Sequence, residues 1–388
     1  MLKQIKKKIR KLYYIVLKKY MKFIYDDKKL QNKVVFTSFN GKSYSDNPKA
    51  ISEALHLLDD KIELVWLFND AKFKRKEVPN YVKIVKKNRK NILKELTSAK
   101  VWVDNFCKEK WIYKSKKQFY IQTWHGDRAI KRILYDSEHV LTQEMLEEKS
   151  CDLAIAGSKF GEELYKTAFH YYGDILCEGS PRNDKLLNIT EKEIKKIKEK
   201  LSIKNEYKIL LFAPTLRRKN SNSHTNQNVG DLKIEKVLQT LEQTTGYKWI
   251  ALIRAHAAVA GLTGIETSDQ IIDVTNYEDM SDLLYITDLL ITDYSSSATD
   301  FQLTRRPMIL YQSDRDEYLK YDRTFYFDLD KSPFIIAKSM NELIEIIKNF
   351  NNVNFKEASE KLDEFYGTCE SGKAAEKIAK IIINKIYG

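Results

Sequence analysis

Short apolar runs alternate with helical patterns along most of the chain after residue 32. The runs are rich in β-branched residues, and between several of them lie stretches with helix signals. Such alternation predicts parallel strands in a sheet whose two faces are covered by helices. Six strands are expected in the first half, at residues 34–38, 62–68, 101–104, 119–123, 152–156 and 175–178.

The same pattern restarts after a charged stretch at 190–200. Two successive halves joined near 185–205 predict an α/β protein with two doubly wound domains that face each other across a cleft. The last 30 residues are expected to be helical. The strands expected in the second half are 208–212, 249–253, 271–274, 289–292, 308–311 and 325–328.

Polar residues mark the starts of several helices. Asn47-Pro48 has the features of an N-cap and a first helical residue, and Ser158 precedes the helical stretch Lys159–Phe169. A further helix is expected over Ser296–Leu303. The polar stretch 218–232 instead predicts a mobile loop beside the cleft.

The first 25 residues predict one amphipathic helix, within a segment assigned as 1–30. Apolar residues recur at three- and four-residue steps, and basic residues surround them with no acidic residue before Asp26. Such a helix suits the interface of an anionic membrane, where each nearby cation contributes about 1 kcal/mol. The alternative is a helix that packs on its own domain with a solvated basic face. The apolar stripe consists of Leu2, Ile5, Ile9, Leu12, Val16, Tyr20 and Phe23.

The composition of the chain excludes several classes of protein and favours one kind of partner. The chain has 388 residues, with 67 Lys and Arg against 54 Asp and Glu and a formal net charge of +13. This surplus favours an anionic partner, but without a recognition-module signature nucleic acid is not expected. The four cysteines have no paired spacing, so neither a disulfide framework nor a structural zinc site is expected, and a reducing cytoplasm is indicated. No apolar run has the ~18–20 residues of a spanning helix.

Arginine is scarce in this chain. There are 13 arginines, and ten of them fall between Arg128 and Arg323. Such a chain is expected to keep arginine where lysine cannot replace it, as in forked hydrogen bonding to phosphate. Residues that carry chemistry are therefore expected in this region.

Two candidate residues follow strands of the first half. His125 precedes Gly126 at a strand–loop junction, where a neutral imidazole is a good base near pH 7. The alternative is a buried structural histidine. The sharp turn Gly179-Ser180-Pro181 presents Arg182 for contact with phosphate, or serves only as a turn.

The second half offers groups suited to a pyrophosphate. Thr215 and Arg217 follow one strand, and Arg254 and His256 follow the next, which combines hydroxyl, guanidinium and imidazole groups.

A serine-rich turn comes after the strand at 289–292. Ser295 and Ser296 precede the expected helix, where free amides bind anions and hydroxyls add donors. The alternative is plain N-capping by either serine. Without a glycine-rich loop the turn is neither a P-loop nor a dinucleotide fingerprint.

The pair Asp328 and Asp330 has a spacing that also occurs in metal sites. No histidine or further carboxylate cluster supports such a site. No metal and no other cofactor is therefore expected.

Taken in order along the chain, these motifs resemble the CDP-glycerol glycerophosphotransferase family, the enzymes that prime or polymerise teichoic acids and related capsule polymers in Gram-positive bacteria. The resemblance covers about residues 33–335, and the ordered set is specific although each piece is short. The matching stretches are 36–48, Trp124-His125-Gly126, Gly179-x-Pro181-Arg182-Asn183-Asp184, Ala213-Pro214-Thr215-x-Arg217, Arg254-x-His256, Thr292-Asp293-Tyr294-Ser295-Ser296 and 306–311.

The resemblance implies a GT-B-type fold of two Rossmann-like domains, with an acceptor domain at 31–190, a CDP-polyol donor domain at 200–360 and a C-terminal helix at 361–388 that crosses back. It implies transfer of glycerol phosphate, or another polyol phosphate, from a CDP-linked donor to a hydroxyl of a membrane lipid-linked acceptor, with release of CMP. The implied partners are CDP-glycerol or CDP-ribitol, a lipid-linked saccharide or polyol-phosphate acceptor, and an anionic membrane. The protein would be peripheral on the cytoplasmic face of that membrane.

The resemblance also assigns roles to individual residues. The histidine of the family's Trp-His-Gly motif maps to His125 as the base, with Trp124 and Asp127 beside it toward the acceptor. The second family histidine maps to His256, which would contact the donor phosphates. The other donor-binding residues implied are Arg182, Thr215, Arg217, Arg254, Asp293, Tyr294, Ser295 and Ser296.

Two positions depart from the family pattern. Ala257 stands where the family usually has proline, and Ser332-Pro333-Phe334 stands where it usually has Pro-Gly-Pro. The main alternative function is a GT-B glycosyltransferase that uses a nucleotide sugar, and a second is a non-catalytic scaffold at the membrane. The length favours addition of one or a few units, or a capsule enzyme, over a polymerase with additional domains.

Overall fold

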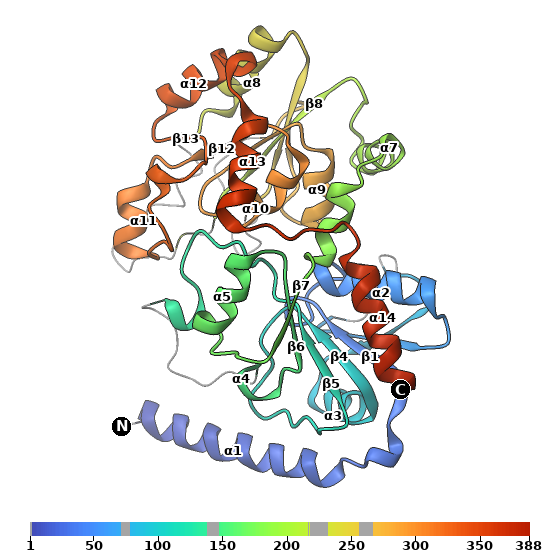
Figure 1. Cartoon of the computed structure of the whole chain (residues 1–388). Helices are drawn as coiled ribbons and strands as arrows, with labels where there is room; N and C mark the ends of the chain where they lie inside the picture. Colours follow the sequence, from blue (N-terminus) through green and yellow to red (C-terminus); the bar gives the residue numbers. More distant parts are fainter. Residues whose placement is uncertain (1, 71–77, 138–146, 216, 218–231, 256–266) are drawn as a thin grey trace. The chain divides into compact units, whose positions relative to one another are not determined.

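The chain folds into two units, each built around one parallel sheet (Figure 1). The computed structural model describes residues 2–70, 78–137, 147–215, 217, 232–255 and 267–388. Unit 1 comprises residues 1–127, 141–184 and 369–388, and unit 2 comprises 128–140 and 185–368. The chain therefore leaves unit 1 directly after the Trp-His-Gly motif, returns to it, and ends in it.

The sheet of unit 1 has seven parallel strands in the order β3-β2-β1-β4-β5-β6-β7. The order reverses between β1 and β4, where Val35 lies opposite Trp102. The strands are β1 (Gln31–Thr37), β2 (Glu63–Phe68), β3 (Val82–Lys86), β4 (Ala99–Asp104), β5 (Phe119–Gln122), β6 (Leu153–Ala156) and β7 (Asp174–Cys177).

Successive residues of these strands pack against different helices, because side chains alternate across a sheet. Val34 and Phe36 pack with α2 (Asp46–Leu58) and α14 (Ala374–Tyr387), which lie side by side on one face (Figure 1). Val35 instead packs with α3 (Arg89–Ser98) on the other face. Unit 1 also contains η1 (Asp27–Lys29), α4 (Glu147–Ser150), α5 (Lys159–Ala168) and η3 (Pro181–Asn183), and α6 (Asp184–Leu187) begins in it.

Helix α1 (Leu2–Ile24) joins the α3 face of unit 1 through part of its surface. Met21 is fully buried there, and Tyr14 and Leu17 are partly buried against the same core cluster. None of these three residues belongs to the apolar stripe expected from the sequence. Among the described residues, no helix combines the length and the apolar character that a membrane crossing requires.

The sheet of unit 2 has six parallel strands in the order β10-β9-β8-β11-β12-β13, reversing between β8 and β11. The strands are β8 (Lys208–Ala213), β9 (Trp249–Ile253), β10 (Ile271–Asp273), β11 (Leu289–Thr292), β12 (Met308–Tyr311) and β13 (Ile336–Ala337). The other elements are η2 (Leu134–Asp136), α7 (Glu191–Lys200), α8 (Ile234–Thr245), α9 (Met280–Ile286), α10 (Ser297–Phe301), η5 (Gln302–Thr304), α11 (Arg315–Tyr321), η6 (Leu329–Lys331), α12 (Met340–Lys348), η7 (Phe350–Asn352) and α13 (Phe355–Tyr366).

Two parallel-sheet, Rossmann-like α/β halves confirm the predicted fold class, but one predicted strand is wrong. Residues 325–328 form no strand, and the last strand of the second sheet is β13. Phe325 makes an isolated antiparallel bridge with Lys131, and its ring stacks on Tyr294. The run 325–328 has the apolar character of a strand, but here its aromatic residues serve ring packing instead of strand pairing. Strands β3 and β13 were not predicted at all.

Helix starts were predicted with mixed success. Ser158 caps α5, since its hydroxyl oxygen accepts a hydrogen bond from the Gly161 amide at 2.9 Å. Helix α2 begins before Asn47, with Ser45 at the N-cap, so the prediction of Asn47 as the cap was wrong. The stretch predicted as a mobile loop, 218–232, lies outside the described residues except for its last, buried residue.

Candidate active site

The carboxyl edge of the unit 1 sheet concentrates unusual backbone geometry. Phe39, Asn40, Asp46 and Trp124 all have positive φ angles, of 43°, 59°, 65° and 47°. Phe39 and Asn40 lie in the loop that follows β1, Asp46 is the first residue of α2, and Trp124 lies in the loop that follows β5. Left-handed geometry costs a non-glycine residue about 1–3 kcal/mol and persists where the surroundings impose it, commonly at functional sites. This edge is therefore the candidate site of unit 1.

His125 occupies this edge in a defined orientation. Its Nδ1 lies 2.7 Å from the main-chain oxygen of Asn105, which follows β4. Because a carbonyl oxygen only accepts hydrogen bonds, Nδ1 carries the proton and donates it. In the neutral ring, Nε2 then carries the lone pair. The geometry thus supports the proton-accepting form that a general base requires.

Aromatic rings surround the imidazole. The centroid of the Trp124 ring lies 4.0 Å from that of His125, the Phe39 ring lies at 5.4 Å, and the Phe106 ring stacks at 6.1 Å with an interplanar angle of 13°. Trp124 is 7% exposed, whereas Phe106 is 40% exposed. Packing against rings restricts the imidazole to the plane set by its hydrogen bond to Asn105.

The side chain of Asn105 is also engaged in holding this edge together. Its Oδ1 accepts a hydrogen bond from the Phe39 amide at 2.7 Å, and its Nδ2 donates to Asp46 Oδ1 at 3.0 Å. Asp46 in turn faces the guanidinium of Arg182, with Nη1 3.4 Å from Oδ2. Arg182, expected to contact phosphate, is 6% exposed and paired with this carboxylate inside unit 1.

Asn47 connects three loops of the same edge. Its Nδ2 donates to the main-chain oxygens of Thr123 and Trp124 at 3.3 and 3.0 Å. Its Oδ1 accepts from the Arg182 amide at 3.0 Å. A side chain that is fully buried and satisfies three main-chain groups fixes the loop that carries His125.

Asp127, expected beside the acceptor, holds the start of α5. Its Oδ2 accepts hydrogen bonds from the Gly157 amide and the Ser158 hydroxyl, both at 2.8 Å. The side chain packs so closely on Gly161 that a Cβ there would lie 2.1 Å from Oδ2. Asp127 is 4% exposed, and these contacts are structural.

The carboxyl edge of the unit 2 sheet is organised around Asp293, directly after β11. Its carboxylate accepts hydrogen bonds from the Thr215 amide at 2.9 and 3.0 Å and from the Tyr294 amide at 2.5 Å. Asp293 is 2% exposed and Tyr294 is fully buried. These contacts join the loop after β8 to the loop after β11, at the reversal of strand order where open α/β sheets bind ligands.

Arg217 is held by two carboxylates of unit 2. Nη1 lies 2.7 Å from Asp293 Oδ2, while Nε and Nη2 lie 2.6 and 3.1 Å from Asp314. Although burial disfavours its charge, these carboxylates raise the pKa of Arg217 above its ordinary value. The guanidinium also lies over the rings of Tyr294 and Tyr318. Most of its donors are thereby used inside the protein.

The remaining predicted donor-binding residues lie around the same edge of unit 2. Arg254 follows β9, where burial lowers its pKa and Nη1 donates to the Tyr277 main-chain oxygen at 2.7 Å. Ser295 and Ser296 precede α10, and Ser296 makes no capping hydrogen bond through its side chain. His256 lies outside the described residues.

Residues 19–384 match the family described as CDP-Glycerol:Poly(glycerophosphate) glycerophosphotransferase. The chain belongs to this family. A teichoic acid glycerol-phosphate transferase of Staphylococcus aureus is 33% identical over 91% of this chain and 94% of its own length. A teichoic acid poly(glycerol phosphate) polymerase of Bacillus subtilis is also 33% identical, but the match spans 48% of that longer protein.

Solved structures agree with this glycerophosphotransferase assignment. The wall teichoic acid polymerase TagF superposes with a TM-score of 0.81 at 28% identity, over 100% of this chain and 98% of that one. A histidine variant of TagF soaked with CDPG superposes with a TM-score of 0.80 at 26% identity. The GT-B-type fold and the prediction that the chain is a CDP-glycerol-using phosphotransferase are thereby confirmed.

Sequence reasoning missed several residues of the candidate site. Asn105 and Asn47 hold the His125 loop, and Asp314 holds Arg217. Asn105 directly follows an apolar strand, which was a usable signal, but no sequence pattern reveals which carbonyl an imidazole contacts. Among the described residues, no three histidine, cysteine or carboxylate side chains cluster as a metal site would need.

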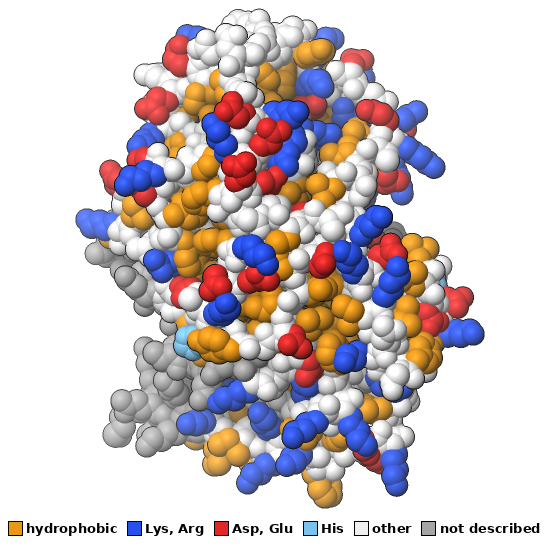
Figure 2. All heavy atoms as spheres, in the orientation of Figure 1, with side chains coloured by type: hydrophobic (Ala, Val, Ile, Leu, Met, Phe, Trp, Pro, Cys, Tyr) orange, Lys and Arg blue, Asp and Glu red, His pale blue; other side chains and the backbone are white. Residues whose placement is uncertain are grey.

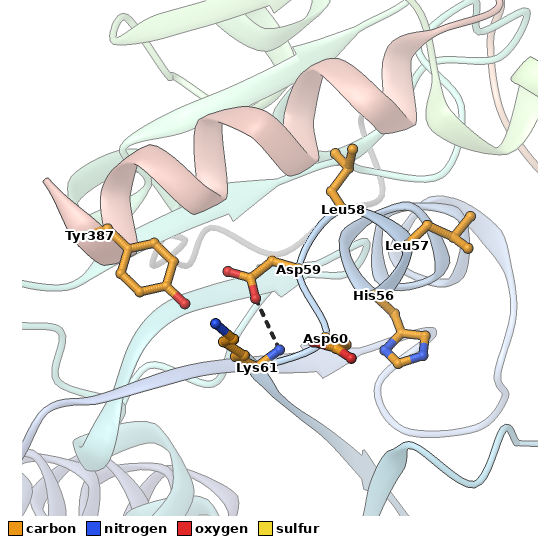
Figure 3. A pocket seen from close by; sticks show the side chains of 7 residues that line it. All are labelled: His56, Leu57, Leu58, Asp59, Asp60, Lys61 and Tyr387. Atoms are coloured by element: carbon orange, nitrogen blue, oxygen red, sulfur yellow. Dashed lines mark hydrogen bonds between the residues drawn. The ribbon is translucent and has the colours of Figure 1, made fainter.

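A surface pocket of unit 1 lies away from these edges. It is formed where α2 ends and β2 has not yet begun, with Tyr387 at the end of α14 (Figure 3). There the Lys61 amide donates to Asp59 Oδ1 at 3.0 Å, while Leu57 is 85% exposed. This is the amino edge of the sheet, and ligands of parallel sheets bind at the carboxyl edge. The pocket is therefore not the candidate active site.

Proposed function

We propose that this glycerophosphotransferase moves glycerol phosphate from CDP-glycerol to a hydroxyl of a membrane lipid-linked acceptor and releases CMP, in teichoic acid or related polymer synthesis. The observation that carries the proposal is the orientation of His125. The hydrogen bond from Nδ1 to the Asn105 carbonyl leaves the lone pair on Nε2, as a base requires.

In the proposed reaction, Nε2 of His125 accepts the proton of the acceptor hydroxyl. The hydroxyl oxygen attacks the β-phosphorus of CDP-glycerol, and the bond from that phosphorus to the bridging oxygen breaks. CMP departs with the electron pair on its phosphate oxygen, and the imidazolium later loses its proton to water. Phosphoryl transfer depends mainly on positioning and charge stabilisation, so a fixed base is the main demand on unit 1.

Donor binding is assigned to the carboxyl edge of unit 2. Thr215, Ser295 and Ser296 supply hydroxyl donors, and Arg254 and His256 supply cationic or neutral nitrogen donors to the phosphates. Asp293, Tyr294 and Arg217 position these groups, because their own polar atoms are engaged with one another and with Asp314. Arg182 acts through the loops of unit 1 for the same reason.

Glycerol is the polyol that the relatives favour. The glycerol-phosphate transferase and polymerases among them are 30–33% identical to this chain, whereas the ribitol-phosphate enzymes are 25–27% identical. We therefore infer that CDP-glycerol is preferred over CDP-ribitol.

Replacing the base tests the proposed reaction. His125→Ala should lower kcat with CDP-glycerol and a water-soluble acceptor analogue by about 10²–10⁴-fold, with donor affinity retained. His56→Ala is the matched control, because His56 stacks on Tyr81 at the amino edge of the same unit. Turnover is measured as CMP release and product mass. Unchanged turnover of the His125 variant would refute the base.

A comparison of nucleotide-linked donors tests which class of substrate the enzyme uses. CDP-glycerol, CDP-ribitol and a UDP-sugar are compared for their effect on the melting temperature and for product formation. A shift and product with CDP-glycerol alone supports the proposal. Product with the UDP-sugar alone would establish the glycosyltransferase alternative.

We further propose that the free face of α1 binds the cytoplasmic face of an anionic membrane. Ile9, Leu12, Val16, Tyr20 and Phe23 follow one stripe and are 51–85% exposed. Exposed basic residues flank the stripe, and Figure 2 shows blue and orange side chains intermixed over α1 at the bottom of the view. Exposed apolar side chains beside cations are the features of an interfacial helix.

Point variants test membrane binding better than a deletion. Removing residues 1–25 would also remove Met21, Leu17 and Tyr14 from the core of unit 1. Val16→Glu with Leu12→Glu should instead abolish most co-sedimentation with vesicles containing anionic lipid and leave turnover of a soluble acceptor analogue unchanged. Leu57→Glu, at another exposed leucine of unit 1, should leave both unchanged. Undiminished vesicle binding by the double variant would exclude this face of α1.

A further inference from the structure

Lys131 lies in the segment that directly follows the His125 loop, yet it belongs to unit 2. The segment pairs with residues before η6: the Tyr326 amide donates to the Ile130 oxygen at 2.9 Å, and the Arg132 amide donates to the Thr324 oxygen at 2.9 Å. Lys131 itself bridges to Phe325. These main-chain contacts fix the residue within unit 2 independently of its side chain.

The side chain of Lys131 reaches the carboxyl edge of the unit 2 sheet. Nζ lies 3.4 Å from Thr215 Oγ1, beside the loop that follows β8. Thr215 is tied to Asp293 through its amide, so the ammonium group lies at the reversal of strand order between β8 and β11. This is the place where an open α/β sheet binds its ligand.

The Lys131 ammonium keeps donors that its arginine neighbour has used. Arg217 bonds two carboxylates and the Thr215 main-chain oxygen. Among the described residues, Lys131 makes one side-chain hydrogen bond, to the Thr215 hydroxyl. Since an ammonium group has three N–H donors, two are not used by the described residues and can serve a ligand. The charged groups that face it are Asp293, Asp322, Arg217 and Arg323.

We propose that Lys131 binds the diphosphate of the CDP-linked donor in unit 2, which rests on the proposed function. Two N–H donors at a strand end, next to the Thr215 hydroxyl, suit adjacent non-bridging phosphate oxygens. A point charge on a flexible stem is a common phosphate ligand in proteins. During transfer the ammonium group also stabilises charge that grows on the departing CMP.

The environment of Lys131 makes this contact sensitive to pH. Burial lowers the pKa of Lys131 to about 8, with Asp293 acting in the opposite direction. The protonated form binds the anion, so full affinity is present below pH 8 and is lost as pH rises above it. A bound diphosphate raises the pKa of Lys131. The affinity for the donor therefore falls between the pKa of Lys131 in the free enzyme and its pKa in the complex, and stays constant at higher pH.

Two substitutions at Lys131 test the proposal by calorimetric titration with CDP-glycerol and with CDP. Lys131→Met should weaken binding of both at pH 7 by about 10- to 100-fold, as expected for loss of a charged hydrogen bond. Lys131→Arg should stay within about threefold, because the charge is retained. Lys198→Met is the matched control, since Lys198 is a buried lysine of unit 2 whose pKa is likewise lowered by burial.

A pH series separates binding from a structural role. The unaltered enzyme should lose donor affinity between about pH 8 and pH 10, whereas Lys131→Arg should not, because arginine stays protonated. If Lys131→Met fails to fold, the difference between the pH profiles of the unaltered enzyme and Lys131→Arg is sufficient to test the proposal. Equal profiles for the two proteins, or a folded Lys131→Met with normal affinity, would overturn the proposal. Failure of the unaltered enzyme to bind CDP-glycerol would refute the proposed function instead.

Discussion

The carboxyl edges of the two sheets hold their functional side chains by different forces. In unit 1, the neutral side chains of Asn105 and Asn47 satisfy main-chain groups around His125. In unit 2, the buried carboxylates of Asp293 and Asp314 hold Arg217. The difference matches two demands of phosphoryl transfer. A base needs a neutral ring in a fixed orientation, whereas a diphosphate site needs charges whose positions do not change when the anion arrives.

The charged edge should be the more costly one to break. Asp293→Asn removes a carboxylate with 3% side-chain exposure and leaves Arg217 with less compensation, so we expect a loss of about 3–5 kcal/mol in unfolding free energy. Asp330→Asn is the control, because Asp330 is 48% exposed in its pairs with Arg315 and Lys338 and should cost less than about 1 kcal/mol. Both are measured by urea denaturation. Similar losses for the two variants would contradict the comparison.

The neutral edge should lose less stability but more catalysis. Asn47→Ala removes hydrogen bonds to Trp124 and Arg182 in a buried place, and should cost about 1–3 kcal/mol. Because the His125 loop loosens, kcat should fall while donor affinity is kept. Asn91→Ala, whose Nδ2 bonds the Lys86 oxygen at the surface, should leave kcat unchanged. A stability loss with normal kcat would show that the loop needs no such anchor.

The aromatic neighbours of the imidazole should have the smallest effect. Phe106→Leu keeps the bulk but loses the ring that stacks on His125, and ring contacts contribute about 0.5–1.5 kcal/mol. We expect kcat to fall by about two- to tenfold, measured with saturating CDP-glycerol. Phe365→Leu, at a similarly exposed ring that packs on Phe327 in unit 2, should leave kcat unchanged. A larger loss of kcat in Phe106→Leu than in Asn47→Ala would contradict the expected order of the two effects.

Most of the fold could be predicted from the sequence because buried parallel strands are short apolar runs between helical patterns. The prediction failed where aromatic residues had another role, as at Phe325, whose ring packs on Tyr294 and whose main chain pairs with Lys131. It also failed at β3, whose Lys83 and Lys86 interrupt the apolar run. Neither error could be avoided without knowing the tertiary contacts.

The site was predictable as a set of strand ends, but less so in its roles. His125 follows a strand and lies where expected, and Thr215 and Asp293 do meet within unit 2. The scarcity of arginine directed attention to Arg182 and Arg217 as phosphate ligands. Both are engaged with carboxylates, and the sequence cannot show this because Asp46 and Asp314 are distant along the chain. Lys131 was overlooked among 54 lysines.

The chain passes from unit 1 into unit 2 close to the proposed base. The chain crosses between Asp127 and Arg128, so a tether of only five residues separates His125 from Lys131, and its six Cα–Cα steps span at most roughly 20 Å when fully extended. Both sides of this tether are anchored, by Asp127 on the start of α5 and by Arg132 on Thr324. The covalent chain itself therefore keeps the proposed base and the proposed diphosphate ligand within that distance of each other.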